Sequence, residues 1–120
     1  MNLPVHVSAQ PKFLGQHEDK FAFAYTISIT NHSETSITLR NRHWIITHAD
    51  GSEEEVIGEG VVGETPELAP GKSYSYTSGA LIPTPMGSMR GSYGFVTEDG
   101  HSFRADIPEF TLHSPDAPLH

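Results

Sequence analysis

The segment from Phe21 to Thr30 alternates between large apolar residues and small or polar ones. Odd positions from 21 to 29 carry Phe, Tyr or Ile, and even positions carry Ala, Thr or Ser. In a β-strand the two sets point to opposite faces of a sheet, whereas a helix would scatter the large residues around its circumference. We therefore expect a strand with one face against a core.

The same alternation recurs in shorter segments separated by turn signals. It changes phase within residues 37–46, which predicts a bulge near residues 40–43. Asp50-Gly51 and Asp99-Gly100 are hairpin signals because these pairs tolerate positive φ angles. Pro108 shifts the phase again and marks a bend or an edge strand. Further strands are predicted over residues 53–57, 72–78, 89–95 and 103–112.

Two segments are too rich in Gly and Pro for regular structure. Residues 58–71 are predicted to form a long ordered loop, and residues 80–87 a second one. About seven strands at this spacing, with no helical segment, are typical of a sandwich or barrel. We expect one all-β domain over residues 1–113, followed by a flexible tail over residues 114–120.

The composition limits the chemistry that the chain can carry. Its 120 residues fit a single domain, and it contains no cysteine. Disulfides, thiolate catalysis, cysteine-ligated zinc and iron–sulfur clusters are thereby excluded, which is compatible with a reducing cytosol. The N-terminus lacks a signal pattern, and no stretch approaches the roughly 18 apolar residues of a membrane span. We expect a soluble, cytoplasmic protein that binds no membrane.

The formal net charge of −8 also restricts the partners. Seven residues are Lys or Arg, against 15 Asp or Glu, and the seven are scattered along the sequence. Nucleic acids and anionic membranes require a clustered basic surface, so neither is expected as a partner. An acidic surface suits cations and basic proteins, although the charge can also serve solubility alone.

A series of motifs in one order resembles the ApaG family. The resemblance covers nearly the whole chain apart from the C-terminal tail, and it includes the strand from Tyr25 to Asn31. The other matching segments are Arg42-His43-Trp44-Ile45-Ile46-Thr47, Gly58-Glu59-Gly60-Val61-Val62-Gly63, Leu68-Ala69-Pro70-Gly71, Tyr76-Thr77-Ser78-Gly79, Gly87-Ser88-Met89-Arg90-Gly91-Ser92-Tyr93 and Ile107-Pro108-Glu109-Phe110-Thr111-Leu112.

This resemblance implies a fibronectin type III/immunoglobulin-like β-sandwich of about seven antiparallel strands. It also implies a soluble bacterial protein, because the stand-alone members are bacterial. In some eukaryotic relatives a similar domain is an interaction module. The family is associated with cobalt and magnesium tolerance and with a gene neighbourhood for diadenosine tetraphosphate hydrolysis. It supplies no catalytic residues to carry over. We therefore expect a non-catalytic module with an unknown protein partner.

The segment from Gly58 to Gly63 satisfies the pattern G-x-G-x-x-G of dinucleotide-binding loops. In those loops a helix follows, and its N-terminus holds the pyrophosphate. Here Pro66 and Pro70 follow and residue 72 begins a strand, so no helix is expected. Two alternatives stay open: a nest of backbone amides that binds an anion, and a tight loop whose glycines need positive φ angles.

No metal, cofactor or catalytic site is predicted. His43 and His48 are five residues apart in a strand and therefore lie on opposite faces, and the other histidines are isolated. The acidic run over residues 53–55 follows no cation-loop pattern and is typical of a solvated strand. Neither Ser78 nor Ser88 lies in a nucleophile motif.

The predicted binding surface lies on the two Gly- and Pro-rich loops and on the sheet edges. Both loops can lie at one end of the sandwich, where their apolar side chains would either supply adaptable contacts to a partner or only cap that end. The candidate residues are Gly58, Gly60, Val61, Val62, Gly63, Pro66, Met86 and Met89. The competing function is a divalent-metal or nucleotide-polyphosphate binding protein or enzyme accessory.

Overall fold

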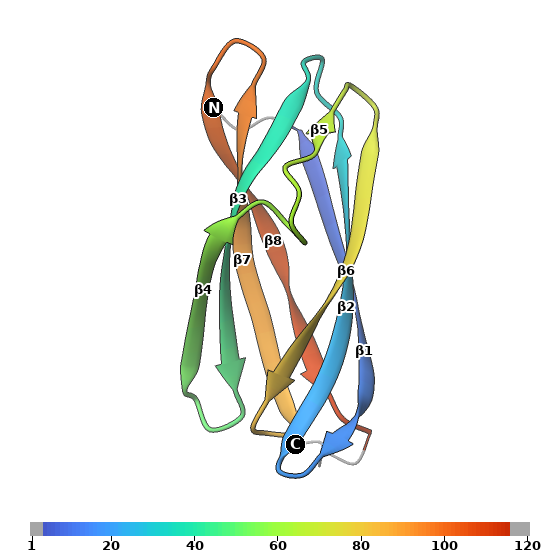
Figure 1. The fold of residues 1–120 in the computed structure, drawn as a ribbon, viewed down its shortest axis with the longest axis vertical. Helices are drawn as coiled ribbons and strands as arrows, with labels where there is room; N and C mark the ends of the chain where they lie inside the picture. Colours follow the sequence, from blue (N-terminus) through green and yellow to red (C-terminus); the bar gives the residue numbers. More distant parts are fainter. Residues whose placement is uncertain (1–3, 116–120) are drawn as a thin grey trace.

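The structure is a computed structural model that describes residues 4–115. In this range the chain forms eight strands and no helix (Figure 1), so the predicted all-β architecture is confirmed, with the long strand β1 and the two-residue strand β5 as additions. The strands are β1 (Val5–His17), β2 (Lys20–Asn31), β3 (Ile37–His48), β4 (Glu53–Glu59), β5 (Glu67–Leu68), β6 (Ser73–Ile82), β7 (Met86–Thr97) and β8 (Ser102–His113). A search of the described residues finds no helix that could span a membrane.

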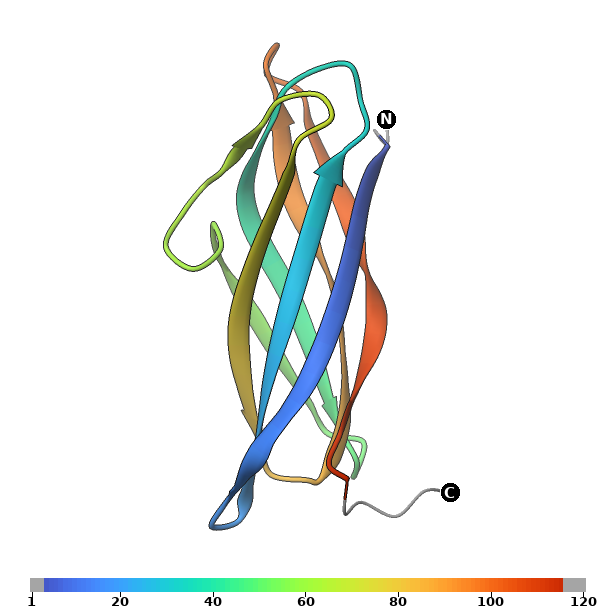
Figure 2. The same cartoon turned by 90° about the vertical axis from the view of Figure 1, so that its right-hand side faces the viewer.

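The strands form two antiparallel sheets that face each other across the core (Figure 1 and Figure 2). One sheet has the order β1-β2-β6, and the other has the order β4-β3-β7-β8, with β5 paired to β3. β1 packs against β8, which closes one side of the sandwich. On the other side, no strand pairing within residues 4–115 joins the edge strands β4 and β6. The sandwich is therefore open on that side.

The core consists of the inward-facing residues of both sheets. The odd positions of β2 from Phe23 to Ile29 are buried, as the alternation predicts. Trp44 of the other sheet lies edge-on to Tyr25 and Tyr93, with ring centroids 5.4 and 6.2 Å apart. Aromatic contacts of this kind contribute about 0.5–1.5 kcal/mol each beyond the area they bury. The contact between Trp44 and Tyr25 joins the two sheets, and the contact between Trp44 and Tyr93 links neighbouring strands of one sheet.

Two irregularities lie where the phase changes predict them. The register of β3 against β7 shifts between Leu39 and Asn41. The register of β8 against β7 shifts around Pro108. β8 is an edge strand, so the missing amide of Pro108 does not interrupt a ladder on its outer side. Both bulges bend their strands and change which side chains face outward.

The Gly- and Pro-rich segments contain more strand than predicted. Residues 58–59 belong to β4, and residues 67–68 form β5. The loop predicted over residues 80–87 is shorter than predicted and comprises residues 83–85, because β6 extends to Ile82 and β7 begins at Met86. A proline removes only its own backbone donor, so Pro83 and Pro85 end the ladder without preventing their neighbours from pairing.

The C-terminal end of the described chain is packed as far as Ser114. This residue is buried, and its amide donates a hydrogen bond to the carbonyl oxygen of Pro85 at 2.9 Å. Residues 116–120 of the predicted tail lie outside the described residues.

Candidate functional site

The open side of the sandwich holds a cleft between β4 and β6, with a volume of about 300 Å³. Tyr25, Trp44 and Met89 form its floor and are nearly inaccessible to solvent. Val56 on β4 and Leu81 on β6 stand at its rims, 38% and 56% exposed. The other lining residues are Arg42, Ile46, Glu54, Ser78, Gly79 and Ala80. The cleft therefore combines an aromatic floor with exposed apolar rims.

The register of β3 and β4 produces this arrangement. Trp44 pairs with Val56, and Ile46 pairs with Glu54, so all four side chains share the inner face of the sheet. Trp44 and Ile46 are covered by the opposite sheet and are buried. Val56 and Glu54 lie one strand further out, on β4. Within the described residues no strand of the opposite sheet covers them. The inner face of β4 is consequently left exposed.

Both edges of the cleft carry unpaired backbone groups. β4 pairs with β3 on one side, and β6 pairs with β2 on one side, and neither has a second partner strand within residues 4–115. An edge strand of this kind presents a row of amide and carbonyl groups that another strand can pair with. Every residue of β4 except Gly58 is exposed. β4 is therefore an accessible template for an added strand.

The edge strand β4 beside the cleft is acidic. Four of the seven residues of β4 are glutamates. Glu54 lines the cleft, where its Oε1 lies 3.6 Å from Nε2 of the buried His48. The lining cation, Arg42, is engaged with backbone: its Nη1 donates hydrogen bonds to the carbonyl oxygens of Glu59 and Gly60 at 2.8 and 3.0 Å. Arg42 keeps its positive charge and offsets Glu54 in the lining, so the negative charge that favours cationic groups is that of the edge strand β4.

A tight hairpin bridges the end of β4 toward β6 and closes the opening beyond the cleft. Val61 and Glu64 exchange backbone hydrogen bonds of 2.8 and 2.9 Å. Between them, Val62 and Gly63 have φ angles of +44° and +82°, which defines a type I′ turn. The Tyr74 hydroxyl of β6 donates to the Glu64 carboxylate at 3.3 Å. The hairpin thus spans the open side of the sandwich.

The glycine pattern over residues 58–63 builds this hairpin. The amide of Gly60 donates to the Arg40 carbonyl oxygen at 2.8 Å, and the amides of Val61 and Glu64 are paired within the hairpin, so three donors are unavailable to an anion nest. The next element is the strand β5, not a helix. A Cβ on Gly60, whose φ is +60°, would lie 2.2 Å from the Glu64 carbonyl oxygen. These contacts support the tight-loop alternative.

The two predicted loops do not lie at one end, so they do not form one shared surface. Gly60 bonds to Arg40, whereas Gly87 pairs with His48 at the far end of β3. Eight residues of extended strand separate Arg40 from His48, a span of about 26 Å. Figure 1 shows the β6–β7 connection beside the β3–β4 turn and the hairpin further up the sandwich.

The predicted contact residues therefore have different roles. Met89 lines the cleft floor. Val61 is fully buried, so its interpretation as a surface contact is wrong, whereas Val62 is 54% exposed at the hairpin tip. The Pro66 carbonyl oxygen accepts a hydrogen bond from the Leu39 amide at 3.0 Å. Gly60 and Gly63 shape the hairpin, Gly58 lies in β4 against the Arg42 guanidinium, and Met86, half-buried, begins β7 at the opposite end.

The rim residues of the cleft escaped the sequence analysis, although they leave a signal. Leu81 is out of phase with the buried positions Tyr76 and Ile82 of its strand, so a large apolar residue stands on the exposed face. Val56 directly follows a run of glutamates. An apolar residue in a polar phase marks an exposed apolar patch, which is the kind of feature that a binding surface needs.

The histidines gather into no metal site in the described residues. No three His, Asp or Glu side chains there are placed to hold an ion. His43 faces outward, with its Nε2 2.6 Å from Oε2 of Glu55, and His48 is buried on the inner face. Their spacing predicts this placement on opposite faces of β3.

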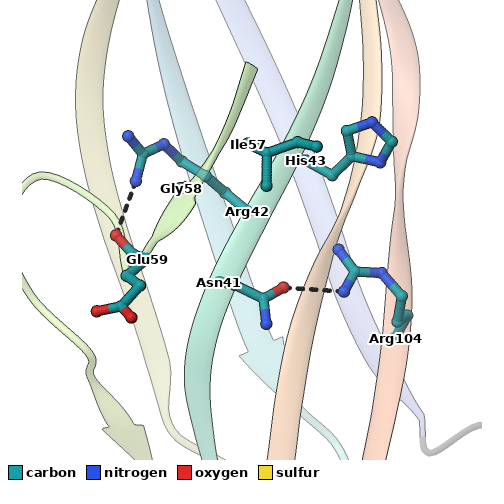
Figure 3. A pocket seen from close by; sticks show the side chains of 7 residues that line it. All are labelled: Asn41, Arg42, His43, Ile57, Gly58, Glu59 and Arg104. Atoms are coloured by element: carbon teal, nitrogen blue, oxygen red, sulfur yellow. Dashed lines mark hydrogen bonds between the residues drawn. The ribbon is translucent and has the colours of Figure 1, made fainter. Parts of the chain in front are cut away.

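A second groove lies on the outer face of the same sheet, with a volume of about 440 Å³ (Figure 3). The Arg104 guanidinium donates from Nη1 to Oδ1 of Asn41 at 2.8 Å, and His43 lines the same groove. Arg42 points away from both, toward the Glu59 carbonyl. The two faces of this sheet therefore carry separate candidate sites.

The fold and the cleft define a small β-sandwich domain with one open side. The family model for the ApaG domain matches residues 11–97. The chain belongs to the ApaG family.

Named relatives match most of the chain. Protein ApaG of Shewanella frigidimarina is 47% identical over 116 residues, which cover 93% of this chain and 92% of the relative. Protein ApaG of Pseudomonas paraeruginosa is 48% identical over 117 residues, which cover 98% of this chain and 93% of the relative. The similarity therefore extends over the whole sandwich.

Solved structures show the same fold. The X-ray structure of the structural genomics target SoR45 superimposes with a TM-score of 0.92 at 44% identity, covering 97% of this chain and 92% of that one. A Bordetella pertussis protein described as ApaA superimposes with a TM-score of 0.90 at 41% identity, covering 96% of this chain and 97% of that one. Both cover nearly their full length.

Proposed function

We propose that this ApaG domain is a non-catalytic module that binds an extended segment of a partner protein at the cleft between β4 and β6. The observation that carries the proposal is the position of the cleft: its aromatic floor lies between two edge strands that have no second partner in the described chain. A segment added to β4 would gain main-chain hydrogen bonds, and an apolar side chain of it would fill the cleft.

The floor gives such a side chain a suitable environment. Tyr25 and Trp44 offer large, rigid ring surfaces, and Met89 offers an adaptable one. Tyr25 and Trp44 are also held by each other, at a ring-centroid distance of 5.4 Å, so the floor is preorganised. A bound side chain would also cover the exposed rim residues Val56 and Leu81. We therefore expect a large apolar residue at the centre of the bound segment.

The charge of β4 indicates a basic partner. Two copies of this chain paired through β4 would bring glutamate against glutamate, and each copy carries a formal charge of −8. A segment with Lys or Arg beside its apolar residue would instead pair with Glu54 and its neighbours. The proposed occupant is consequently a basic, extended segment of another protein in the cytoplasm.

The competing function receives less support from the geometry. A divalent-metal site lacks a ligand set among the described residues, and the amides at the start and end of the glycine-rich hairpin are already bonded. Calorimetric titration with Mg²⁺, Co²⁺ and ATP separates the two functions. We expect no saturable heat for any of them, whereas saturable binding lost on Gly60→Ala would favour the competing function. If no binding is observed, the family's association with cobalt and magnesium tolerance would act through the protein partner.

Selection from an unbiased library of short displayed peptides tests the proposal. We expect enrichment of sequences with a large apolar residue flanked by Lys or Arg. Affinity of a selected peptide should fall about tenfold or more for Val56→Asp, which puts a charge at the rim of the cleft. Ile57→Asp is the matched control, because Ile57 is the next residue of β4, points to the outer face and is 71% exposed. Equal affinity for wild type and Val56→Asp would refute the proposal.

A further inference from the structure

A small groove on the outer face of the β3-β7-β8 sheet is lined by cationic and neutral groups, although the chain has 15 acidic and seven basic residues. Its volume is about 200 Å³. The lining residues are Arg40, Asn41, Gly94, Phe95, Ser102, Phe103 and Arg104. Two guanidinium groups therefore share one groove without a lining carboxylate.

The guanidinium of Arg104 is held in one orientation. Its Nε donates to Oγ of Ser92 at 2.9 Å, and its Nη1 donates to Oδ1 of Asn41 at 2.8 Å. Gly94 leaves the space for this bond: a Cβ there would lie 2.4 Å from Oδ1 of Asn41 and 2.8 Å from Nη1 of Arg104. A fixed guanidinium loses less conformational entropy when it binds an anion.

The bulge in β3 supplies the other donors. Leu39 pairs with Phe95 and Asn41 with Gly94, so Arg40 is the extra residue of the bulge and is exposed beside the groove. Because Oδ1 of Asn41 accepts from Arg104, the free end of this amide is its Nδ2, a donor. Bulges commonly redirect side chains beside functional sites.

Within residues 4–115, neither Arg40 nor Arg104 forms an ion pair. Arg90 is the arginine in this range that does, with Glu53. A guanidinium stays charged at any physiological pH, so both positive charges are available to a ligand. We propose that this groove binds a phosphate group, either as free inorganic phosphate or as the phosphate of a small phosphate monoester. Two guanidinium groups, an amide and the Ser102 hydroxyl offer more donors than a planar carboxylate can use.

The surroundings favour a single phosphate over a polyphosphate. The groove continues into its larger neighbour through Asn41 and Arg104, and the lining of that neighbour includes Glu59. A second phosphate placed there would approach a carboxylate, and His43 is already engaged with Glu55. The organic part of a monoester can lie there instead, beside the exposed Ile57.

Amide and side-chain NMR spectra during titration with inorganic phosphate, glycerol phosphate, pyrophosphate and acetate at constant ionic strength test this inference. We expect saturable shifts of the Asn41 side-chain amide and the Gly94 amide with phosphate, and weaker effects of acetate and pyrophosphate. Tighter binding of glycerol phosphate than of inorganic phosphate identifies a monoester headgroup as the ligand, and equal or weaker binding identifies free phosphate.

Two exposed arginines make a matched pair of variants. Arg40→Gln should weaken phosphate binding about tenfold, since it removes one charge-assisted contact. Arg90→Gln removes the same charge from the outer face but affects only the contacts with Glu53 and Thr47, and its phosphate affinity should stay unchanged. Absence of saturable shifts in the wild type, or equal losses for both variants, would overturn the inference.

Discussion

The hydroxyl groups of Tyr76 and Tyr93 are hydrogen-bonded to each other inside the core. Tyr76 belongs to β6 of one sheet and Tyr93 to β7 of the other, so the bond crosses the interior between the sheets. Tyr93 is completely inaccessible to solvent, and its hydroxyl has no other bonding partner among the described residues. The pair satisfies two polar atoms that would otherwise be buried alone.

Removing one hydroxyl should therefore cost more than removing both. Tyr76→Phe leaves the Tyr93 hydroxyl buried without a partner, which we expect to lower the free energy of unfolding by about 1–3 kcal/mol. The double variant Tyr76→Phe/Tyr93→Phe should recover much of this loss, because no polar atom remains unsatisfied. Urea unfolding of the four proteins of the cycle measures the coupling. Strictly additive losses would contradict the relationship.

The same pair predicts alkaline destabilisation. Burial raises the pKa of Tyr76 to about 12 and raises the pKa of Tyr93 further above the ordinary value of 10.0. Above pH 10 the unfolded state loses these protons before the native state does, so the stability that they contribute is complete below pH 10 and falls as the pH rises toward 12 and beyond. Unfolding free energies measured from pH 8 to 12 should show this decrease, and the double Phe variant should show a shallower one. Identical pH profiles would argue against it.

The hairpin over residues 61–64 contains a backbone strain that substitution can relieve. Val62 has a φ of +44°, a conformation that β-branched residues rarely adopt, at a position of a type I′ turn where Asn is preferred. Val62→Asn should stabilise the fold by about 1 kcal/mol. Gly60→Ala should destabilise it by about 2 kcal/mol or more, because its Cβ meets the Glu64 carbonyl oxygen. Thermal melts compare the two, and a lower melting temperature for Val62→Asn would be inconsistent with strain at this turn.

The adjacent valines separate core from surface in this hairpin. Val61→Asp places a carboxylate at a fully buried position and should unfold much of the protein, at a cost of several kcal/mol. Val62→Asp changes an exposed side chain at the tip and should shift the melting temperature little. Circular dichroism melts of the two variants check this difference. Similar melts for both would place Val61 outside the core.

Strand periodicity predicted most of the strands of this fold, although not β1, and the resemblance to the family indicated a sandwich rather than a barrel. The alternation in residues 21–30 and the phase changes near Arg40 and Pro108 reflect local backbone geometry, which a sequence pattern reports directly. The Gly- and Pro-rich segments were predicted less well, since strand pairing from neighbours extends β6 and β7 into them. Tertiary pairing of this kind overrides local composition.

The cleft was not predictable because it depends on which strands become edges. Val56 and Leu81 belong to strands of different sheets, and only the strand order brings them to the same opening. Val61 shows the converse case: its place in a glycine-rich loop indicates the surface, but the type I′ turn directs it into the core. A sequence pattern indicates to which side of its sheet a side chain points. Which strands pack against that side depends on the strand order.

The most direct test of the proposed function is amide hydrogen exchange of the protein with and without a selected basic, apolar peptide. If the peptide adds a strand to β4, amides within residues 53–59 should exchange about tenfold more slowly in the complex, while β1, an edge strand on the closed side of the sandwich, keeps its rates. Protection confined to residues outside β4 and β6, or binding without any protection of β4, would contradict strand addition at the cleft.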